Sequence, residues 1–252
     1  MKKPLLLIPF ILTACTSYQY VPNSQTVPLF TTEKTLNLNC MGNGHSFYGS
    51  GAYSLTNHLA VSVSGNSYQK SITSNPWFAS DSCEYYNSKN IDFDGALGYF
   101  NHYDIISYEV YSGFGYGTSN FKHKYYEYTN GLSSGSNDSI YYKANKFKWF
   151  IQPDLGIKLS NSLEVILSSR FSVDTYRTHN LAYNKLKTNQ EYNFFNSNNE
   201  RTIFLIEPAI TLRTTFDYLN FQIQAIRLVY ISTSKLYYNN VCLNFGICMN
   251  FH

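Results

Sequence analysis

The side chains best suited to acid–base chemistry lie in or beside segments rich in Ser, Asn, Tyr and Lys: His123, Asp138, Asp174 and His179. A hydrolytic site needs a base within hydrogen-bond reach of its partner, whereas histidines in segments of this composition are usually ordinary loop residues. His45, His123 and His179 also lack the spacing of metal ligands. We therefore expect a protein that is not an enzyme and that holds no metal or cofactor.

A different reactive residue, Cys15, ends the N-terminal stretch MKKPLLLIPFILTAC. Lys2 and Lys3 precede the apolar residues 4–14, which are too few for a membrane-spanning helix of about 20 residues. A basic start and a short apolar core are typical of a secretory signal. The residues LTAC (12–15) resemble the lipobox of bacterial lipoproteins, which implies cleavage before Cys15 and its acylation. The alternative is a plain signal with a chance cysteine near the cut.

Composition favours an all-β membrane protein. Charged residues make up 14% of the chain, against about 25% in typical soluble domains, and aromatic residues make up 17%. The net charge is only +3 and no basic patch is concentrated anywhere in the sequence. We therefore expect no nucleic-acid partner.

Alternation with period two begins at Thr35 and predicts strands rather than helices. In LAVSVSG (59–65), for example, Leu59, Val61 and Val63 share one face. Several of the expected strands approach fifteen residues, longer than strands of soluble domains. The expected strands lie near residues 35–41, 46–55, 58–68, 90–101, 104–118, 145–159, 162–175, 201–215, 218–232 and 239–251.

Short and long connections alternate between these strands. The short turns are expected near residues 56–57, 101–104, 160–161 and 216–218. The long loops are expected at 69–89, 119–144 and 176–200. This pattern predicts an antiparallel up-and-down transmembrane β-barrel of about ten strands, or of eight if the first two strands form a folded-in arm.

The distribution of charge predicts which face of the barrel meets lipid. A soluble barrel would wet its outer face with many charged side chains, but the polar face of these strands carries only a few, of both signs. Such charges can pair in a narrow lumen and are costly against lipid. We therefore predict these residues to face the lumen: Glu109, Asp154, Lys158, Glu164, Arg170, Glu207 and Arg213.

Two strands share a pattern around a proline: WFIQPDLGIKL (149–159) contains Pro153, and FLIEPAITLR (204–213) contains Pro208. Proline cannot donate a hydrogen bond to the ladder and is confined to edges, strand starts and bulges. We therefore predict a local bulge at each proline.

Three segments resemble a known family: YVPNSQTVPLF (20–30), GAYSLTNHLAV (51–61) and the alternating C-terminal strand that includes Phe251. The resemblance is to small outer-membrane β-barrel lipoproteins of double-membraned bacteria. With the lipobox, it divides the chain into a lipoprotein signal peptide (1–14), a lipid-anchored periplasmic strap (15–33) and an outer-membrane β-barrel (34–252). For the strap we favour a spacer between lipid and barrel over a plug in the periplasmic mouth.

No residue pattern identifies a ligand. We predict a monomer in the cell outer membrane, in contact with its lipid, with the N-terminus anchored on the periplasmic side because no acidic run follows Thr16. Its predicted role is structural or surface-interacting, with residues 119–144 and 176–200 contacting a surface ligand. Two alternatives stay open: a narrow outer-membrane channel, and a soluble lipid-tethered barrel that binds a small hydrophobic ligand.

Overall fold

The computed structural model describes residues 20–74, 82–129, 132–184, 200–214, 216, 218–230 and 241–251. The predicted signal peptide and Cys15 lie outside the described residues, so they stay predictions. In the part of the chain that is described, no helix is long and apolar enough to cross a membrane.

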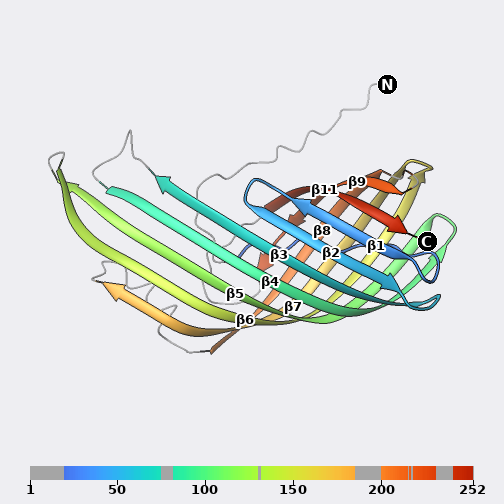
Figure 1. The fold of residues 1–252 in the computed structure, drawn as a ribbon, viewed down its shortest axis with the longest axis horizontal. Helices are drawn as coiled ribbons and strands as arrows, with labels where there is room; N and C mark the ends of the chain where they lie inside the picture. Colours follow the sequence, from blue (N-terminus) through green and yellow to red (C-terminus); the bar gives the residue numbers. More distant parts are fainter. Residues whose placement is uncertain are drawn as a thin grey trace, which may run out of the picture.

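Antiparallel strands close into a barrel (Figure 1), in which each strand pairs with its neighbours in the chain and β11 pairs with β1. The strands are β1 (Leu36–Gly42), β2 (Ser46–Ser54), β3 (Leu59–Ser74), β4 (Ser82–Tyr103), β5 (Ile106–Thr129), β6 (Leu132–Ser160), β7 (Leu163–Asn184), β8 (Glu200–Thr214), β9 (Leu219–Arg227), β10 (Val229–Tyr230) and β11 (Val241–Phe251). Because β9 and β10 both pair with β8 in one register, they form a single barrel strand. The predicted ten-stranded all-β barrel is confirmed, and the eight-stranded alternative is wrong.

The two ends of the barrel differ. At the short-turn end, β4 and β5 are joined after Tyr103, and β6 and β7 are joined after Ser160. At the opposite end, which we call the long-hairpin end, β3 to β7 continue past the shorter strands as a curved sheet (Figure 1). In contrast, β1 ends at Gly42 and β2 begins at Ser46, so the wall is low there.

The segments expected as long loops are largely strand. The β5–β6 ladder continues to the pair Thr129 and Leu132, and the β6–β7 ladder continues to Ser139 and Asn184. Tyr and Thr favour strands, and each added pair extends the ladder of hydrogen bonds. The expectation of loops is therefore wrong at 69–74, 82–89, 119–129, 132–144 and 176–184.

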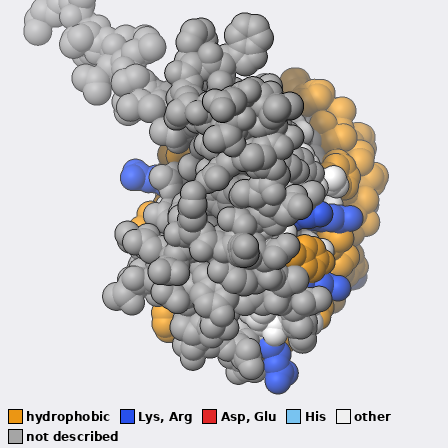
Figure 2. All heavy atoms as spheres, turned by 90° about the vertical axis from the view of Figure 1, so that its left-hand side faces the viewer, with side chains coloured by type: hydrophobic (Ala, Val, Ile, Leu, Met, Phe, Trp, Pro, Cys, Tyr) orange, Lys and Arg blue, Asp and Glu red, His pale blue; other side chains and the backbone are white. Residues whose placement is uncertain are grey.

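Alternate residues face lipid and lumen. Leu97, Val63 and Phe93 are 69%, 66% and 62% exposed on the outer face. Figure 2, which faces the long-hairpin end, shows hydrophobic side chains along the outer wall. Exposed aromatic side chains, including Tyr103 and Tyr218, lie at the short-turn end, as expected at a membrane interface. The soluble-barrel alternative needed the apolar face inside, and this arrangement contradicts it.

The ladder breaks at both prolines. Between β6 and β7, pairing stops after Ile151 and resumes at Asp154, which leaves Pro153 in the gap. Between β8 and β9–β10, pairing stops in the same way around Pro208. The register is unchanged across each break, so the predicted bulges are wrong. The proline nitrogen cannot donate, and only a hydrogen-bonded pair is lost.

Candidate functional site

Residues 20–30, which we call the plug segment, run through the lumen without forming a strand, and all of them are buried. We expected this stretch to be a spacer outside the barrel, and over these residues that expectation is wrong. A ten-stranded barrel is wider than the eight-stranded barrels that side chains alone fill. A single segment of the chain occupies the additional space.

The plug segment runs from the long-hairpin end to the short-turn end. Tyr20 lies in a cluster with Phe121, Tyr142 and Tyr176, close to where the strands project. Phe30 lies at the other end, where its ring centroid is 5.5 Å from that of Phe100. The chain then turns toward β1, and just before that strand the Lys34 amide donates to the carbonyl of Ser54 at 2.8 Å.

Polar wall residues bind the first part of the plug segment. The Tyr20 hydroxyl donates to Glu207 Oε1 at 2.9 Å, and the Lys146 ammonium lies 5.1 Å from the Tyr20 ring centroid. The Asn23 amide donates to Asp92 Oδ2 at 3.3 Å, and Asn23 Oδ1 accepts from Asn66 at 2.7 Å. The first part of the plug segment therefore contacts charged and amide side chains of the wall.

At mid-depth, side-chain amides of the wall satisfy the backbone of the plug. Gln224 Oε1 accepts from the Gln25 amide at 2.9 Å, and Gln224 Nε2 donates back to the Gln25 carbonyl at 3.2 Å. Gln152 Nε2 donates to the Thr26 carbonyl at 2.7 Å. These bonds replace the strand partner that the plug lacks, because buried backbone groups are costly without one.

Near the short-turn end, charged side chains bind the backbone of the plug. Arg213 donates to the carbonyls of Val27 and Pro28, the latter at 3.4 Å. The Phe30 amide donates to Glu109 Oε1 at 2.7 Å. Charge-assisted bonds of this kind are stronger than neutral ones.

A buried ion network surrounds the plug on the side of β4, β6 and β7. Lys146 Nζ lies 2.7 Å from Asp92 Oδ1 and 4.0 Å from Asp174 Oδ2. Lys148 Nζ lies 2.8 Å from Asp94 Oδ2, with side chains 1% and 5% exposed. Paired in this way, charges inside the barrel avoid the cost of isolated burial.

Arg170 connects this network to the plug. Its Nη1 lies 3.7 Å from Asp94 Oδ2, and its Nε and Nη2 donate to Gln152 Oε1 at 3.1 and 2.8 Å. Gln152 in turn donates to the Thr26 carbonyl of the plug. One cation therefore couples the wall charges to the backbone of the plug segment.

The structure places the predicted lumen residues as follows. Five are buried inside the barrel: Glu109, Asp154, Arg170, Glu207 and Arg213. Glu164, whose side chain is 13% exposed, lies 3.5 Å from Arg213 near the short turns. Lys158 is exposed, and with both of these residues it lines a cavity of about 360 Å³ at the short-turn end.

Sequence reasoning missed part of the network: Asp92, Asp94, Lys146 and Lys148. The same alternation that predicted the other lumen residues applies to them, so the signal was available. Asp174, which we considered as a candidate acid, is buried beside Lys146 and away from solvent. The side chains of His123, Asp138 and His179 lie outside the described residues. In the described part, no group of three or more His, Cys, Asp or Glu residues is arranged to hold a metal ion.

Apart from the cavity at the short-turn end, which Pro28, Leu29 and Phe30 also line, the cavities described beside the plug segment are small. A cavity next to Tyr20 and Lys146 holds about 10 Å³, and another next to Thr26 and Arg170 also holds about 10 Å³. Each is space for about one water molecule. The arrangement is that of a filled lumen.

Comparisons with known proteins define the class. No family model and no curated protein matches the chain. The crystal structure of the outer membrane protease OmpT from Escherichia coli is similar, with a TM-score of 0.54 and 9% identity over 88% of this chain and 98% of that one. A major outer membrane protein from Thermus thermophilus has a TM-score of 0.35 and 11% identity over 86% of this chain and 99% of that one. LpxR from Salmonella typhimurium has a TM-score of 0.31 and 8% identity over 86% of this chain and 99% of that one.

The fold is therefore that of an outer-membrane β-barrel. At 9% identity, the likeness to OmpT extends to the fold alone.

Proposed function

We propose that this protein is a sealed outer-membrane barrel, tethered at Cys15, whose role is structural or surface-interacting. The plug segment is the observation that carries the proposal, because it fills the lumen from Tyr20 to Phe30. A transport role needs an open path, and here each plug residue is buried against the wall. The part left for contact with other molecules is the projecting sheet of β3 to β7.

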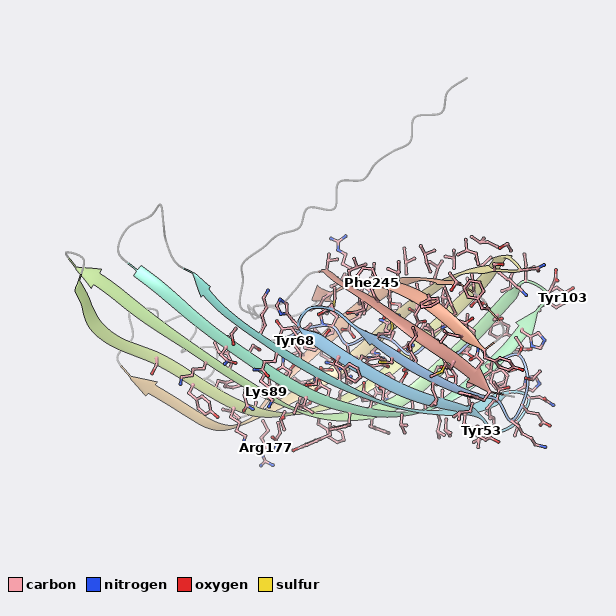
Figure 3. The ribbon with its side chains drawn as sticks, turned by 45° about the horizontal axis from the view of Figure 1, so that its top comes forward. Tyr53, Tyr68, Lys89, Tyr103, Arg177 and Phe245 are labelled. Atoms are coloured by element: carbon pink, nitrogen blue, oxygen red, sulfur yellow. The ribbon has the colours of Figure 1, made fainter. Side chains whose placement is uncertain are left out.

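Orientation follows from the asymmetry of the two ends. In outer-membrane barrels the short turns are periplasmic and the long connections are extracellular. Four exposed cationic residues lie on neighbouring projecting strands just beyond the apolar outer face: Lys89, Lys122, Lys143 and Arg177. Figure 3 marks Lys89 and Arg177 there, and Tyr103 at the opposite end. Cations at this level suit the phosphate groups of the outer-membrane lipid.

Two measurements test the sealed barrel. Folded barrels that resist SDS until heated shift in mobility, so boiled and unboiled samples of the full chain should differ on a gel. The same preparation, inserted in planar bilayers, should then give no discrete conductance steps. Steps from heat-modifiable protein would instead support the narrow channel, and an unchanged mobility with release into buffer by protease would contradict an embedded barrel.

A hairpin truncation tests the surface role. Lys122 and Tyr141 are directly paired, so residues 123–140 can be replaced by Asn-Gly, which favours a two-residue hairpin turn. The variant should fold and stay heat-modifiable. Cells carrying the full chain should bind immobilised glycans or host-surface extracts better than cells carrying the truncated chain. Equal binding by the two would contradict a contact role for this hairpin.

A further inference from the structure

The direction of the plug segment determines where the chain before it emerges. Tyr20 lies at the long-hairpin end, and Val21 packs against Tyr68 of β3. Tyr68 pairs with Ser46, the first residue of β2. The plug segment therefore begins beside the rim formed by the β1–β2 hairpin.

This rim is the low side of the wall. The row of paired residues that begins at Ser46 and Tyr68 continues through Asn90 to Ser119. Asn90 and Ser119 line the small cavity around Tyr20, so β2 starts in the same row in which the plug starts. On this side, β1 and β2 extend no further than the level at which the plug segment begins.

The residues between Cys15 and Tyr20 are too few to let Cys15 lie at the short-turn end. Cys15 precedes Tyr20 by five residues, which span at most about 18 Å when fully extended. Asn90 lines the cavity around Tyr20, and Phe100 lies beside Phe30, so the plug segment runs past ten residues of β4, about 33 Å at the usual strand rise. Cys15 therefore cannot reach the short-turn end, even if the lumen had space for a second chain.

We propose that the acylated Cys15 is anchored at the long-hairpin end, in the outer leaflet, and that the chain is threaded through its own barrel. The inference rests on the proposed function for the acylation and for the orientation of the barrel. It reverses the periplasmic side that the residues after Cys15 favoured. The barrel then holds the lipid anchor on the cell surface, and closure of β11 on β1 traps the chain inside.

Cysteine labelling in cells tests the placement. Three single variants, Ser17→Cys, His45→Cys and Ser162→Cys, are treated with a membrane-impermeant maleimide before and after permeabilisation of the outer membrane, with the parent chain as the background. His45 is an exposed residue of the β1–β2 turn, and Ser162 is an exposed residue of the β6–β7 turn. We expect Ser17→Cys and His45→Cys to react in intact cells, and Ser162→Cys only after permeabilisation.

The outcomes separate this proposal from the one on which it rests. If Ser17→Cys reacts only after permeabilisation, as Ser162→Cys does, the anchor is periplasmic and the threading proposal is overturned. If His45→Cys and Ser162→Cys exchange their behaviour, the barrel orientation is wrong. Mass spectrometry of the N-terminal peptide should find acyl chains on Cys15, and an unmodified Cys15 would overturn the anchor itself.

Cross-linking of two introduced cysteines tests the threading independently. The Asn66 amide donates to Asn23 Oδ1 at 2.7 Å across the plug and wall. The double variant Asn23→Cys/Asn66→Cys, treated in cells with the short thiol cross-linker dibromobimane, should be cross-linked, seen as a mobility difference between treated and untreated samples after boiling. The pair Asn23→Cys/Ser162→Cys, with Ser162 in the turn at the short-turn end, should not. Absence of the first cross-link in folded barrels would overturn the proposal.

Discussion

Replacing Lys148 by methionine removes one cation from the centre of the lumen and keeps most of the side-chain volume. Lys148 Nζ lies 2.8 Å from Asp94 Oδ2, and the two side chains are 1% and 5% exposed. The variant therefore leaves a buried carboxylate without its nearest partner. It tests whether the lumen is dry and packed, as the sealed barrel requires.

The expected loss follows from the distances. At an effective dielectric constant of about 20, unit charges 2.8 Å apart attract by about 6 kcal/mol. Part of this is offset by the cost of desolvating the lysine, and breaking a buried pair typically costs about 3–5 kcal/mol. Because Arg170 Nη1 stays 3.7 Å from Asp94, we expect the lower end of that range, about 3 kcal/mol.

The assay is urea unfolding of protein folded in detergent micelles, followed by tryptophan fluorescence. Lys143→Met is the matched control, because Lys143 is an exposed residue of the same strand, and its loss should change the free energy of unfolding by less than about 0.5 kcal/mol. The double variant Lys148→Met/Asp94→Asn removes the unpaired carboxylate and should recover much of the loss.

A small effect of Lys148→Met would refute the reasoning. Solvent-exposed ion pairs contribute about 0–1 kcal/mol, so a loss in that range would mean that water screens the pair. The plug segment would then not exclude solvent from the centre of the barrel. The conductance of the full chain would then have to be measured again, to test for a water-filled path through the lumen.

Two further predictions concern packing and the membrane. A methyl group at Gly115 would meet Asp94 Oδ1, whereas one at Gly95 meets no atom within 4 Å. Gly115→Ala should therefore lower the free energy of unfolding by about 1–3 kcal/mol and Gly95→Ala should not, by the same urea assay. Leu97 is 69% exposed on the outer face, so Leu97→Lys should cost about 2–4 kcal/mol in lipid vesicles. Tyr141→Lys, on the projecting part of β6, should cost about 0–1 kcal/mol, and equal costs would contradict the proposed position of the membrane.

The strands and their faces were predictable from the sequence. Side chains of a strand alternate between two faces, so one correct assignment of the apolar face determines the direction of every other residue in that strand. Glu109, Arg170 and Glu207 could therefore be assigned to the lumen without any knowledge of their partners. Asp94 and Lys148 obeyed the same rule and could have been assigned with them.

The length of the projecting strands had a local signal that we did not use. Asn130-Gly131 lies between Thr129 and Leu132, and this dipeptide is a strong signal for a two-residue hairpin turn. The polar composition of the flanking residues suggested a loop instead. Polar strands are stable here because the ladder of β5 and β6 extends from a barrel that is already closed.

What the sequence by itself determined is therefore the class of fold and the face on which each strand residue lies, because these depend on neighbours in the chain. The structure decided between ten strands and eight. Only the tertiary structure placed residues 20–30 in the lumen. That stretch has no periodicity, and its partners are remote: Gln25 and Gln224 are 199 residues apart, and Val27 and Arg213 are 186 residues apart. Such contacts exist only after the barrel has closed around the segment that fills it.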